Sequence, residues 1–502
     1  MRPLIRDVLL MAVATTASRI LGLGREAVIA NTFGTTAAYD AFLIAFFVPH
    51  FLRQLLAEGA LSTAFVPIYT KLDVAGDHAD RFASNLLSCL LVTFPFVAAA
   101  GILLAPAYVP FLASGFAPDK LALAISLTRV VFPFLILVGF SAVFMGILNA
   151  HHRFFPASFA PVWFNVGMIL GVAVIARWFP SEPIYGLGIG VLLGGTGQLV
   201  SQVPSLRRLR FHFHFAVLPL HPGVRELAVR MAPAVLALAA AQINLLVDNK
   251  LASHLGDGGI SSLQYAMRLF QLPLGVFAVS LATALLPRLS SAHARGQSDR
   301  FSRYVNDGIA ASLFIMIPAT VGLLLVGTDV IRLLFEHGSF SAADTLRTGR
   351  VLSYYAIGLL PYGLVYVSNR ASYALGRTVV PLIATLASVA VNVSLDLLLV
   401  GPLRESGLAL ATSAAGLVNA LTLLWFLRSR LGSAHDLLNR LARIALGTAL
   451  LAATVWGVRV AVGGSPFLAA LIPAFAGMVV YFVYARVAGL WSLLRPENSE
   501  TK

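Results

Sequence analysis

The chain has 502 residues, of which 58% are hydrophobic and only 12% are charged. Soluble proteins contain about 45–50% apolar and about 25% charged residues. The mean hydropathy is +0.84, which is more apolar surface than compact soluble domains can bury, so lipid must surround most of the chain. This composition excludes an ordinary cytoplasmic enzyme, a disordered protein and a disulfide-rich secreted scaffold.

The net charge of +14 indicates contact with anionic headgroups rather than with nucleic acid. Basic residues collect in the cytoplasmic loops of membrane proteins, and no basic run in this sequence alternates with base-stacking aromatic residues. The single cysteine, Cys89, cannot form an internal disulfide and carries no metal or redox signal.

Hydropathy and the positions of Pro, Gly and charged residues predict fourteen membrane-spanning helices. Each needs about 20 mostly apolar residues. The expected spans are 7–32, 39–68, 82–112, 121–149, 156–177, 184–205, 226–254, 260–287, 306–335, 344–374, 378–400, 406–427, 437–461 and 466–490.

The distribution of Lys and Arg over the loops orients these spans. Most basic loop residues lie on one side of the predicted membrane, while the opposite loops offer little beyond Lys120 and Arg404. By the positive-inside rule both termini are cytoplasmic, which requires an even number of spans. The basic segments are 68–82, 150–155, 206–230, 288–305, 375–378, 428–443 and the C-terminal tail.

The chain contains an internal repeat. Residues 34–71 and a segment about 220 residues later share a glycine turn, a mid-helix proline (Pro49, Pro273) and a second proline near the end (Pro67, Pro287). Six helices per repeat predict two parallel copies around a central cavity. The expected parts are an N-terminal lobe (1–206), a basic cytoplasmic linker (207–225), a C-terminal lobe (226–430), and two extra helices with a cytoplasmic tail (431–502).

Several possible chemical motifs have simpler explanations. The Gly-rich run from Gly186 to Gly197 lies inside a predicted span, and its small-xxx-small spacing favours close helix packing over a nucleotide loop. His212 and His214 occur in a basic loop where solvation is the simpler interpretation. There is no Walker A sequence and no evident nucleophile–base pair, so we expect no enzymatic activity.

Ionisable residues inside the predicted spans are the strongest functional signal. Such residues are costly in lipid and line water- or substrate-filled spaces. Arg25 and Arg268 each lie about 10–12 Å from the outer end of their helices, so they can converge on the cavity and bind phosphate oxygens. For Glu26, Asp40 and Glu58 a purely structural ion pair is the alternative. The full set is Arg19, Arg25, Glu26, Asp40, Arg53, Glu58 and Arg268.

Four oxygen-bearing side chains form a second candidate site in the predicted C-terminal lobe. They lie at similar depths in their spans and suit a small hard cation. Plain polar packing, or pairing of an aspartate with Lys250, remains the alternative from spacing alone. The four residues are Asp248, Asn392, Asp396 and Thr412.

Several segments closely resemble MurJ-type lipid II flippases, members of the multidrug/oligosaccharidyl-lipid/polysaccharide exporter superfamily. The resemblance extends over nearly the whole chain. It is clearest in SRILGLGREAVIANTFG, DAFLIAFFVPHFLRQLLAEGALSTAFVPI, LPLGVFAVSLATALLP and FEHGSF. Three positions depart from the usual pattern: Glu26 replaces a more common Asp, Gln54 a second Arg, and Met267 an Asp.

The resemblance implies that the chain moves lipid II across the bacterial inner membrane for peptidoglycan synthesis. It places the cavity arginines at Arg19, Arg25, Arg53 and Arg268 and the helix-1 acid at Glu26. It also implies a sodium site at the four residues named above and a lipid-tail groove at the last two spans. We expect a monomer whose partners are lipid II and membrane lipids, with no cofactor other than this ion.

Other functions are less consistent with the sequence. A cation-coupled exporter of drugs or of another polyprenyl-linked glycan is the nearest alternative, but a drug exporter for cations needs an apolar or acidic cavity. A membrane enzyme acting on polyprenyl phosphates needs a catalytic acid–base set, and a structural scaffold would not need arginines inside its spans. Sodium, protons and membrane voltage all remain open as driving forces.

Overall fold

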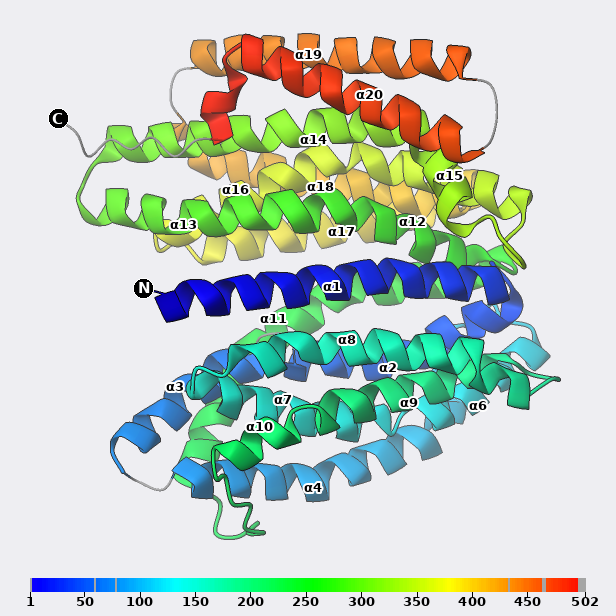
Figure 1. Cartoon of the computed structure of the whole chain (residues 1–502), viewed down its shortest axis with the longest axis vertical. Helices are drawn as coiled ribbons and strands as arrows, with labels where there is room; N and C mark the ends of the chain where they lie inside the picture. Colours follow the sequence, from blue (N-terminus) through cyan, green and yellow to red (C-terminus); the bar gives the residue numbers. More distant parts are fainter. Residues whose placement is uncertain (1, 58–59, 77–78, 432–433, 463–465, 495–502) are drawn as a thin grey trace. The chain divides into compact units, whose positions relative to one another are not determined.

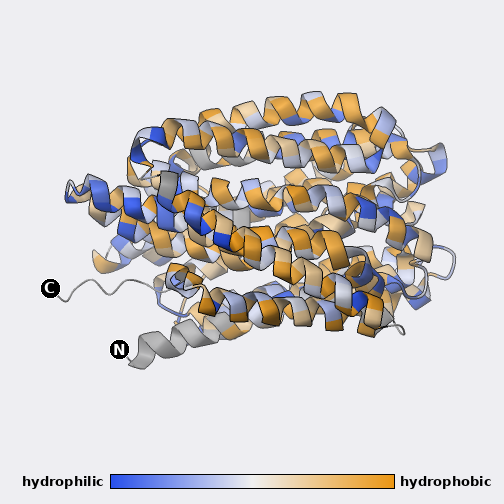
Figure 2. Cartoon of the chain, turned by 90° about the horizontal axis from the view of Figure 1, so that it is seen from above, coloured by the Kyte–Doolittle hydropathy of each residue, from blue (hydrophilic) through white to orange (hydrophobic). Residues whose placement is uncertain are grey.

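The computed structural model describes residues 2–57, 60–76, 79–431, 434–462 and 466–494. Within these residues every regular element is a helix, and no strand is present. This confirms the prediction of an all-α membrane protein. Hydrophobic residues cover much of the helices, while hydrophilic residues gather toward helix ends and loops (Figure 2).

The chain forms two compact units. The first contains residues 1–258 together with 338–340, and the second contains the remainder. The helices of the first unit are α1 (Arg2–Phe33), α2 (Ala37–Ala57), α3 (Ala60–Val74), α4 (Ala79–Leu103), α5 (Ala105–Leu112), α6 (Pro118–Val131), α7 (Phe134–Ala150), α8 (Phe154–Ala173), η1 (Ile175–Trp178), α9 (Ile184–Val200), α10 (Val203–Arg208), α11 (Pro222–Ala252) and η2 (Ser253–Leu255) (Figure 1).

The second unit contains the remaining helices, including one short π-helix, η3. They are α12 (Gly259–Pro273), η3 (Leu274–Ala278), α13 (Val279–Ala294), α14 (Ser298–Phe335), α15 (Ala342–Ile357), α16 (Leu359–Ala374), α17 (Val379–Leu403), α18 (Glu405–Leu427), η4 (Arg428–Arg430), α19 (Ala434–Ala461), α20 (Pro466–Val487) and η5 (Leu490–Leu494).

Each of the fourteen expected spans corresponds to one helix or to a short series of helices. In the described part of the chain, ten helices are long and apolar enough to cross a membrane, and an eleventh span is formed if α15 and α16 count together. These two meet at a 41° bend beside Gly358. The expected span 39–68 contains α2 and α3, and residues 58–59 between them lie outside the described part.

Prolines explain one of the helix irregularities. Proline lacks the N–H that an α-helix needs and clashes with the preceding turn. Pro273 ends α12, and the chain continues as the π-helix η3 before α13 begins. π-helical turns are rare insertions within α-helices. The expected span 260–287 is therefore a helix with a local change of winding, five residues beyond Arg268.

Close packing of α8 against α9 depends on glycine, as the small-residue spacing predicted. A Cβ on Gly167 would lie 2.2 Å from the Gly194 nitrogen, and one on Gly171 would lie 2.4 Å from the Gly186 carbonyl oxygen. Side chains at these positions would push the two backbones apart. The glycines therefore fix the position of α8, which carries two residues of the site described below.

The second unit includes the two C-terminal helices. Figure 1 shows α19 and α20 beside α14, and the three helices pack through a buried cluster that includes Phe314, Ile444 and Tyr481. The Tyr481 hydroxyl donates to the Phe314 carbonyl at 2.6 Å. Asp329 of α14 forms an ion pair of 2.9 Å with Arg459 of α19. Both apolar and polar contacts thus hold this pair to the second unit.

The boundary of the compact units differs from the boundary expected from the repeat. The predicted C-terminal lobe begins at residue 226, whereas α11 belongs to the first unit, where it packs against α3, α4 and α5. Repeat boundaries follow internal similarity, and compact units follow contacts, so the two need not coincide. The lobes stay a prediction about the repeat.

Candidate functional site

Arg25 is the centre of a polar cluster inside the first unit. It lies eight residues before α1 ends at Phe33, which corresponds to about 12 Å along the helix. Its side chain is only 11% exposed, and its Nη2 is 2.5 Å from Oε1 of Glu26. Its Nη1 donates to Oδ1 of Asn165 at 3.0 Å. The guanidinium is therefore held by one carboxylate and one neutral amide.

Asn165 fixes this arrangement from α8. Its Oδ1 accepts from Arg25, while its Nδ2 donates to the backbone carbonyl of Ser18 at 3.0 Å. The residue is buried, and its amide lies over Gly22, where a Cβ would be 3.9 Å from both amide atoms. Both ends of the amide are thus used between α1 and α8. This orientation is the one that presents an acceptor to Arg25.

Phe164 links Arg25 to a second arginine. The Cζ atoms of Arg25 on α1 and Arg53 on α2 each lie 5.9 Å from the centre of the Phe164 ring. Cations are attracted to aromatic faces at such distances. The ring itself packs against Phe46 and Phe134. Two guanidinium groups, distant in sequence, therefore gather around one fixed ring.

The structure unites part of the predicted arginine set. Arg25, Glu26 and Arg53 lie in one cluster of the first unit. Arg19, also on α1, has an exposed side chain. Arg268 is half-buried on α12 and belongs to the second unit.

Asp40 of α2 forms a structural ion pair, which is the alternative that the sequence left open for this residue. It is fully buried and accepts from Lys120 Nζ at 2.8 Å and from the Gly258 backbone nitrogen at 2.8 Å. Lys120 also contacts Asp257 at 3.0 Å. This group ties the start of α2 to α6 and to the turn after η2. The other predicted acid, Glu58, lies outside the described residues.

The predicted cation ligands occur in both units. Asn392 and Asp396 are buried one turn apart on α17, and Thr412 on α18 donates its hydroxyl proton to the Leu408 carbonyl at 3.0 Å. Asp248 lies on α11 in the first unit. Lys250, the alternative partner, lies 4.2 Å from the Phe111 ring centre.

The cation site formed by these four residues therefore stays a prediction. Over the described residues, no group of three or more His, Cys, Asp or Glu side chains is arranged to hold a metal ion. The predicted set contains only two carboxylates, so this finding does not concern it. Two buried oxygen-bearing side chains on one face of α17 fit a hard cation.

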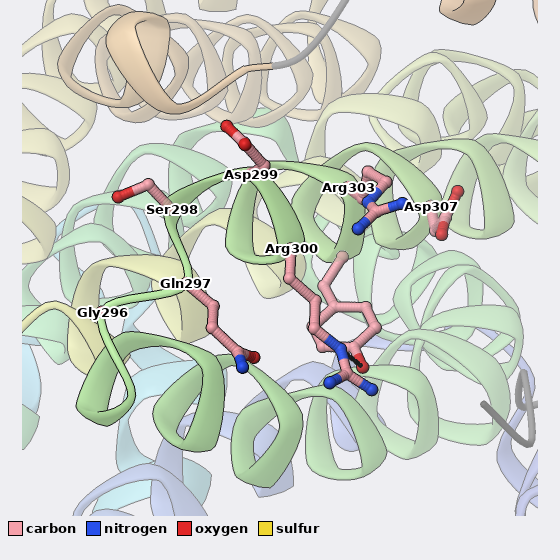
Figure 3. A pocket seen from close by; sticks show the side chains of 8 residues that line it. Gly296, Gln297, Ser298, Asp299, Arg300, Arg303 and Asp307 are labelled. Atoms are coloured by element: carbon pink, nitrogen blue, oxygen red, sulfur yellow. Dashed lines mark hydrogen bonds between the residues drawn. The ribbon is translucent and has the colours of Figure 1, made fainter. Parts of the chain in front are cut away.

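A cavity of about 610 Å³ opens at the turn between α13 and α14 (Figure 3). Arg300 and Arg303 project from the first turns of α14, and Nε of Arg300 donates to the Tyr304 hydroxyl at 2.9 Å. Two aspartates share the wall with the two arginines, so the charge is mixed. None of the predicted site residues lines it. Its lining residues are Gly296, Gln297, Ser298, Asp299, Arg300, Arg303, Tyr304 and Asp307.

Sequence reasoning missed three residues of these clusters. Phe164 is an ordinary apolar residue of a span. Asn165 lies in the fifth span, where the sequence marks it only as the counterpart of Asn392 in the fifth span of the second repeat. Lys120 is identified as an outer basic residue without a partner. An amide inside an apolar span is the one signal that could have singled out Asn165, because buried polar groups require partners.

The fold and the cluster of half-buried arginines in the first unit define a multi-pass helical membrane transporter. A multidrug resistance MATE family transporter of the MOP superfamily, in an inward-facing conformation, has the same fold, with a TM-score of 0.70 at 16% identity over 84% of this chain and 98% of that one. A solved lipid II flippase MurJ in an inward closed conformation matches with a TM-score of 0.83 at 29% identity, covering 97% of this chain and 100% of that one.

The family model described as lipid II flippase MurJ matches residues 29–482, and the chain belongs to this family. A Rhizobium meliloti protein named "Probable lipid II flippase MurJ" is 36% identical over 88% of this chain and 84% of its own length. A Thermotoga maritima protein of the same name is 32% identical over 96% of both chains. "Lipid II flippase MurJ" of Burkholderia cenocepacia is 32% identical over 85% and 84%.

Proposed function

We propose that the cluster of Arg25, Arg53, Phe164 and Asn165 binds the pyrophosphate of lipid II during its passage across the membrane. The chain is a lipid II flippase, a transporter and not an enzyme, and it acts in the bacterial inner membrane in the supply of peptidoglycan precursors. The observation that carries the proposal is the pair of guanidinium groups placed 5.9 Å from one half-buried ring.

A pyrophosphate is suited to this cluster by charge and by shape. Guanidinium forks donate two parallel hydrogen bonds to phosphate oxygens. Arg25 is already oriented by Asn165 and Glu26, so little side-chain freedom is lost when an anion binds. We assign Arg19 and Arg268 to the same substrate, as the family resemblance implies. The undecaprenyl tail remains in lipid, and inward-open and outward-open states alternate.

A drug exporter of the same superfamily is not favoured. The MATE transporter shares the fold at 16% identity, which supports the architecture alone. Cationic drugs would be repelled by two arginines beside the ring, whereas an anionic headgroup is attracted.

We propose sodium as the coupling ion, bound by Asp248, Asn392, Asp396 and Thr412. Asp396 is buried and Asp248 is half-buried. Two carboxylates that share one ion repel each other where the dielectric constant is low, and a cation relieves that repulsion. An ion that binds one access state more tightly shifts the equilibrium toward that state. A cysteine placed beside Arg53, with Cys89 replaced, should then be labelled differently in sodium and in potassium, and Asp396→Asn should abolish the difference. Equal labelling in the parent protein would leave protons or voltage as the driving force.

We further propose that both termini face the cytoplasm. The basic loops support this orientation through the positive-inside rule. A reporter fused after Arg210 should read cytoplasmic and one at Gly338 periplasmic. Reversed signals would overturn the orientation.

The direct test of function uses purified protein in vesicles with labelled lipid II in one leaflet. We expect translocation without chemical change of the lipid, and none in empty vesicles. Chemical cleavage or modification of lipid II by the protein would instead indicate an enzyme. Equal transport of a cationic drug would favour the exporter.

A further inference from the structure

The segment from residue 211 to 221, between α10 and α11, has no helical structure but is not loosely attached. Three polar side chains of α4 hold its backbone: Ser84, Asn85 and Ser88. Asn85 donates through Nδ2 to the Ala216 carbonyl at 2.7 Å and accepts through Oδ1 from the His221 nitrogen at 2.9 Å. Ser88 Oγ accepts from the Ala216 nitrogen at 3.0 Å. The segment therefore lies along α4 in a fixed conformation.

This fixed segment presents large apolar side chains outward. Phe215 is 62% exposed and Leu218 83% exposed, and Phe213 and Leu220 are about half exposed. A soluble surface seldom keeps several such residues together unless something else covers them. The hydrogen bonds to α4 thus hold the backbone in place while the apolar side chains remain available.

The position along α4 indicates what covers them. Residues 82–88 of α4 are buried, whereas Leu91, Val92 and Phe96 are exposed at 42%, 51% and 76%. These exposed residues belong to an apolar span and so face lipid. Ser88 lies three residues, or about 5 Å, before Leu91. The segment at Ala216 is therefore level with the edge of the lipid-facing surface.

The charged residues before this segment also indicate that it lies at the surface of the lipid bilayer. Arg207, Arg208 and Arg210 immediately precede the segment and all have exposed side chains. Arginine beside exposed aromatic residues is the composition of segments that lie in the headgroup region, where the rings enter the acyl boundary and the cations meet anionic phosphates.

We propose that residues 207–220 form an interfacial anchor that inserts Phe213, Phe215 and Leu218 into the headgroup region and binds anionic phospholipid through the three arginines. The ligand is the lipid surface itself, not the transported substrate, so this inference is independent of the proposed function. The anchor would hold the connection between α10 and α11 at a constant depth during transport.

The anchor can be tested with single cysteines, because Cys89 is the one cysteine in the sequence. In a Cys89→Ala background, Phe215→Cys or Leu218→Cys is labelled with an environment-sensitive fluorophore in vesicles of phosphatidylcholine and phosphatidylglycerol. Val74→Cys is the matched control. It is 83% exposed and is the last residue of α3, while α4 begins at Ala79, about 13 Å along the helix from Ser88.

We expect labels at 215 and 218 to be quenched by headgroup-region spin-labelled lipid and protected from aqueous iodide, with the opposite result at 74. Iodide quenching at 215 and 218 equal to that at 74 would overturn the anchor and leave the surface open to solvent or to a protein partner. All three substitutions are at exposed positions, and gel filtration of each variant verifies its fold.

A separate pair of variants tests whether the three arginines bind anionic lipid. Replacing Arg207, Arg208 and Arg210 by Gln should lower the preference of the labelled segment for spin-labelled phosphatidylglycerol over phosphatidylcholine by roughly fivefold per arginine. The same charge change in the second unit, at Arg295, Arg300 and Arg303, should leave that preference unchanged. An equal effect of both triple variants would show that net charge alone determines the preference, and would contradict specific binding by the segment.

Discussion

Two clusters of charged residues in the first unit, one around Asp40 and one around Arg25, differ in the contacts that surround the charge. In one, Asp40 is fully enclosed and receives hydrogen bonds from Lys120 and from the backbone nitrogen of Gly258. In the other, Arg25 pairs with the carboxylate of Glu26 and also contacts neutral groups: the amide of Asn165, the sulfur of Met168 and the ring of Phe164. Both arrangements contain an ion pair, but the second also places a second guanidinium, that of Arg53, and uncharged groups beside Arg25 and Glu26.

This difference separates a structural ion pair from a binding site. A buried pair is strongly destabilised when one partner is removed, because the other charge is left in a low-dielectric environment. A site for an anion instead needs cations that are oriented in advance and can exchange their neutral contacts for the ligand. The two groups should therefore respond oppositely: one should control stability, and the other should control transport.

The largest expected effect is on transport when Arg25 is replaced. Arg25→Ala should abolish lipid II translocation while the protein still folds, and Arg25→Lys should restore little of it because an ammonium lacks the bidentate fork. Arg268→Ala is expected to behave in the same way. Translocation in proteoliposomes and thermal unfolding of the same samples provide the measurement. Full activity in either alanine variant would refute this role.

The next largest effect is on stability when Lys120 is replaced. Lys120→Met should lower the free energy of unfolding by about 3 kcal/mol, because Asp40 keeps its charge in a buried position. The double variant Asp40→Asn, Lys120→Met should recover part of this loss. Lys71→Met, at an exposed position, is the matched control. A stability equal to the parent in Lys120→Met would show that the pair does not support the fold.

A smaller effect is expected at Asn165. Asn165→Leu removes the acceptor for Arg25 and the donor to Ser18, and should reduce translocation about tenfold. Asn165→Asp sharpens the comparison, because a second carboxylate beside Arg25, in addition to that of Glu26, would neutralise the charge of the cluster and compete with pyrophosphate. Transport by the aspartate variant at the parent rate would contradict the requirement for a neutral partner.

The smallest effect is expected at Phe164. Phe164→Leu should lower the affinity for lipid II about two- to fivefold, since cation–π contacts at partly exposed sites contribute about 0.5–1 kcal/mol. Phe164→Tyr keeps the ring and should bind like the parent. Phe155→Leu, at an exposed position of the same helix, is the control. A leucine variant with unchanged affinity would show that the ring serves packing alone.

The sequence predicts the fold class and the charged residues better than their partners. Hydropathy predicts the fourteen helical segments, because lipid requires long apolar helices. Arg25, Glu26 and Arg53 are predictable since charge inside a span is costly. Phe164 is not, because an aromatic residue in an apolar span is common. The Asp40–Lys120 pair joins residues 80 apart in sequence, and a hydropathy pattern contains no information on such contacts.

The sequence pattern also does not predict which of the two compact units each helix belongs to. α11 has apolar residues throughout, and nothing in its periodicity indicates that it packs against α3, α4 and α5. The repeat groups it with the later helices because similarity follows the order of the chain. Contacts depend instead on the shapes of the facing helices.

The most direct test of the central claim is the equilibrium affinity for lipid II of three proteins in nanodiscs: the parent, Arg25→Ala and Asp40→Asn. If the arginine cluster binds the pyrophosphate, Arg25→Ala should weaken binding by at least about tenfold, whereas Asp40→Asn should lower the unfolding temperature and leave the affinity unchanged. Parent-like affinity in Arg25→Ala, or a loss confined to Asp40→Asn, would contradict the account.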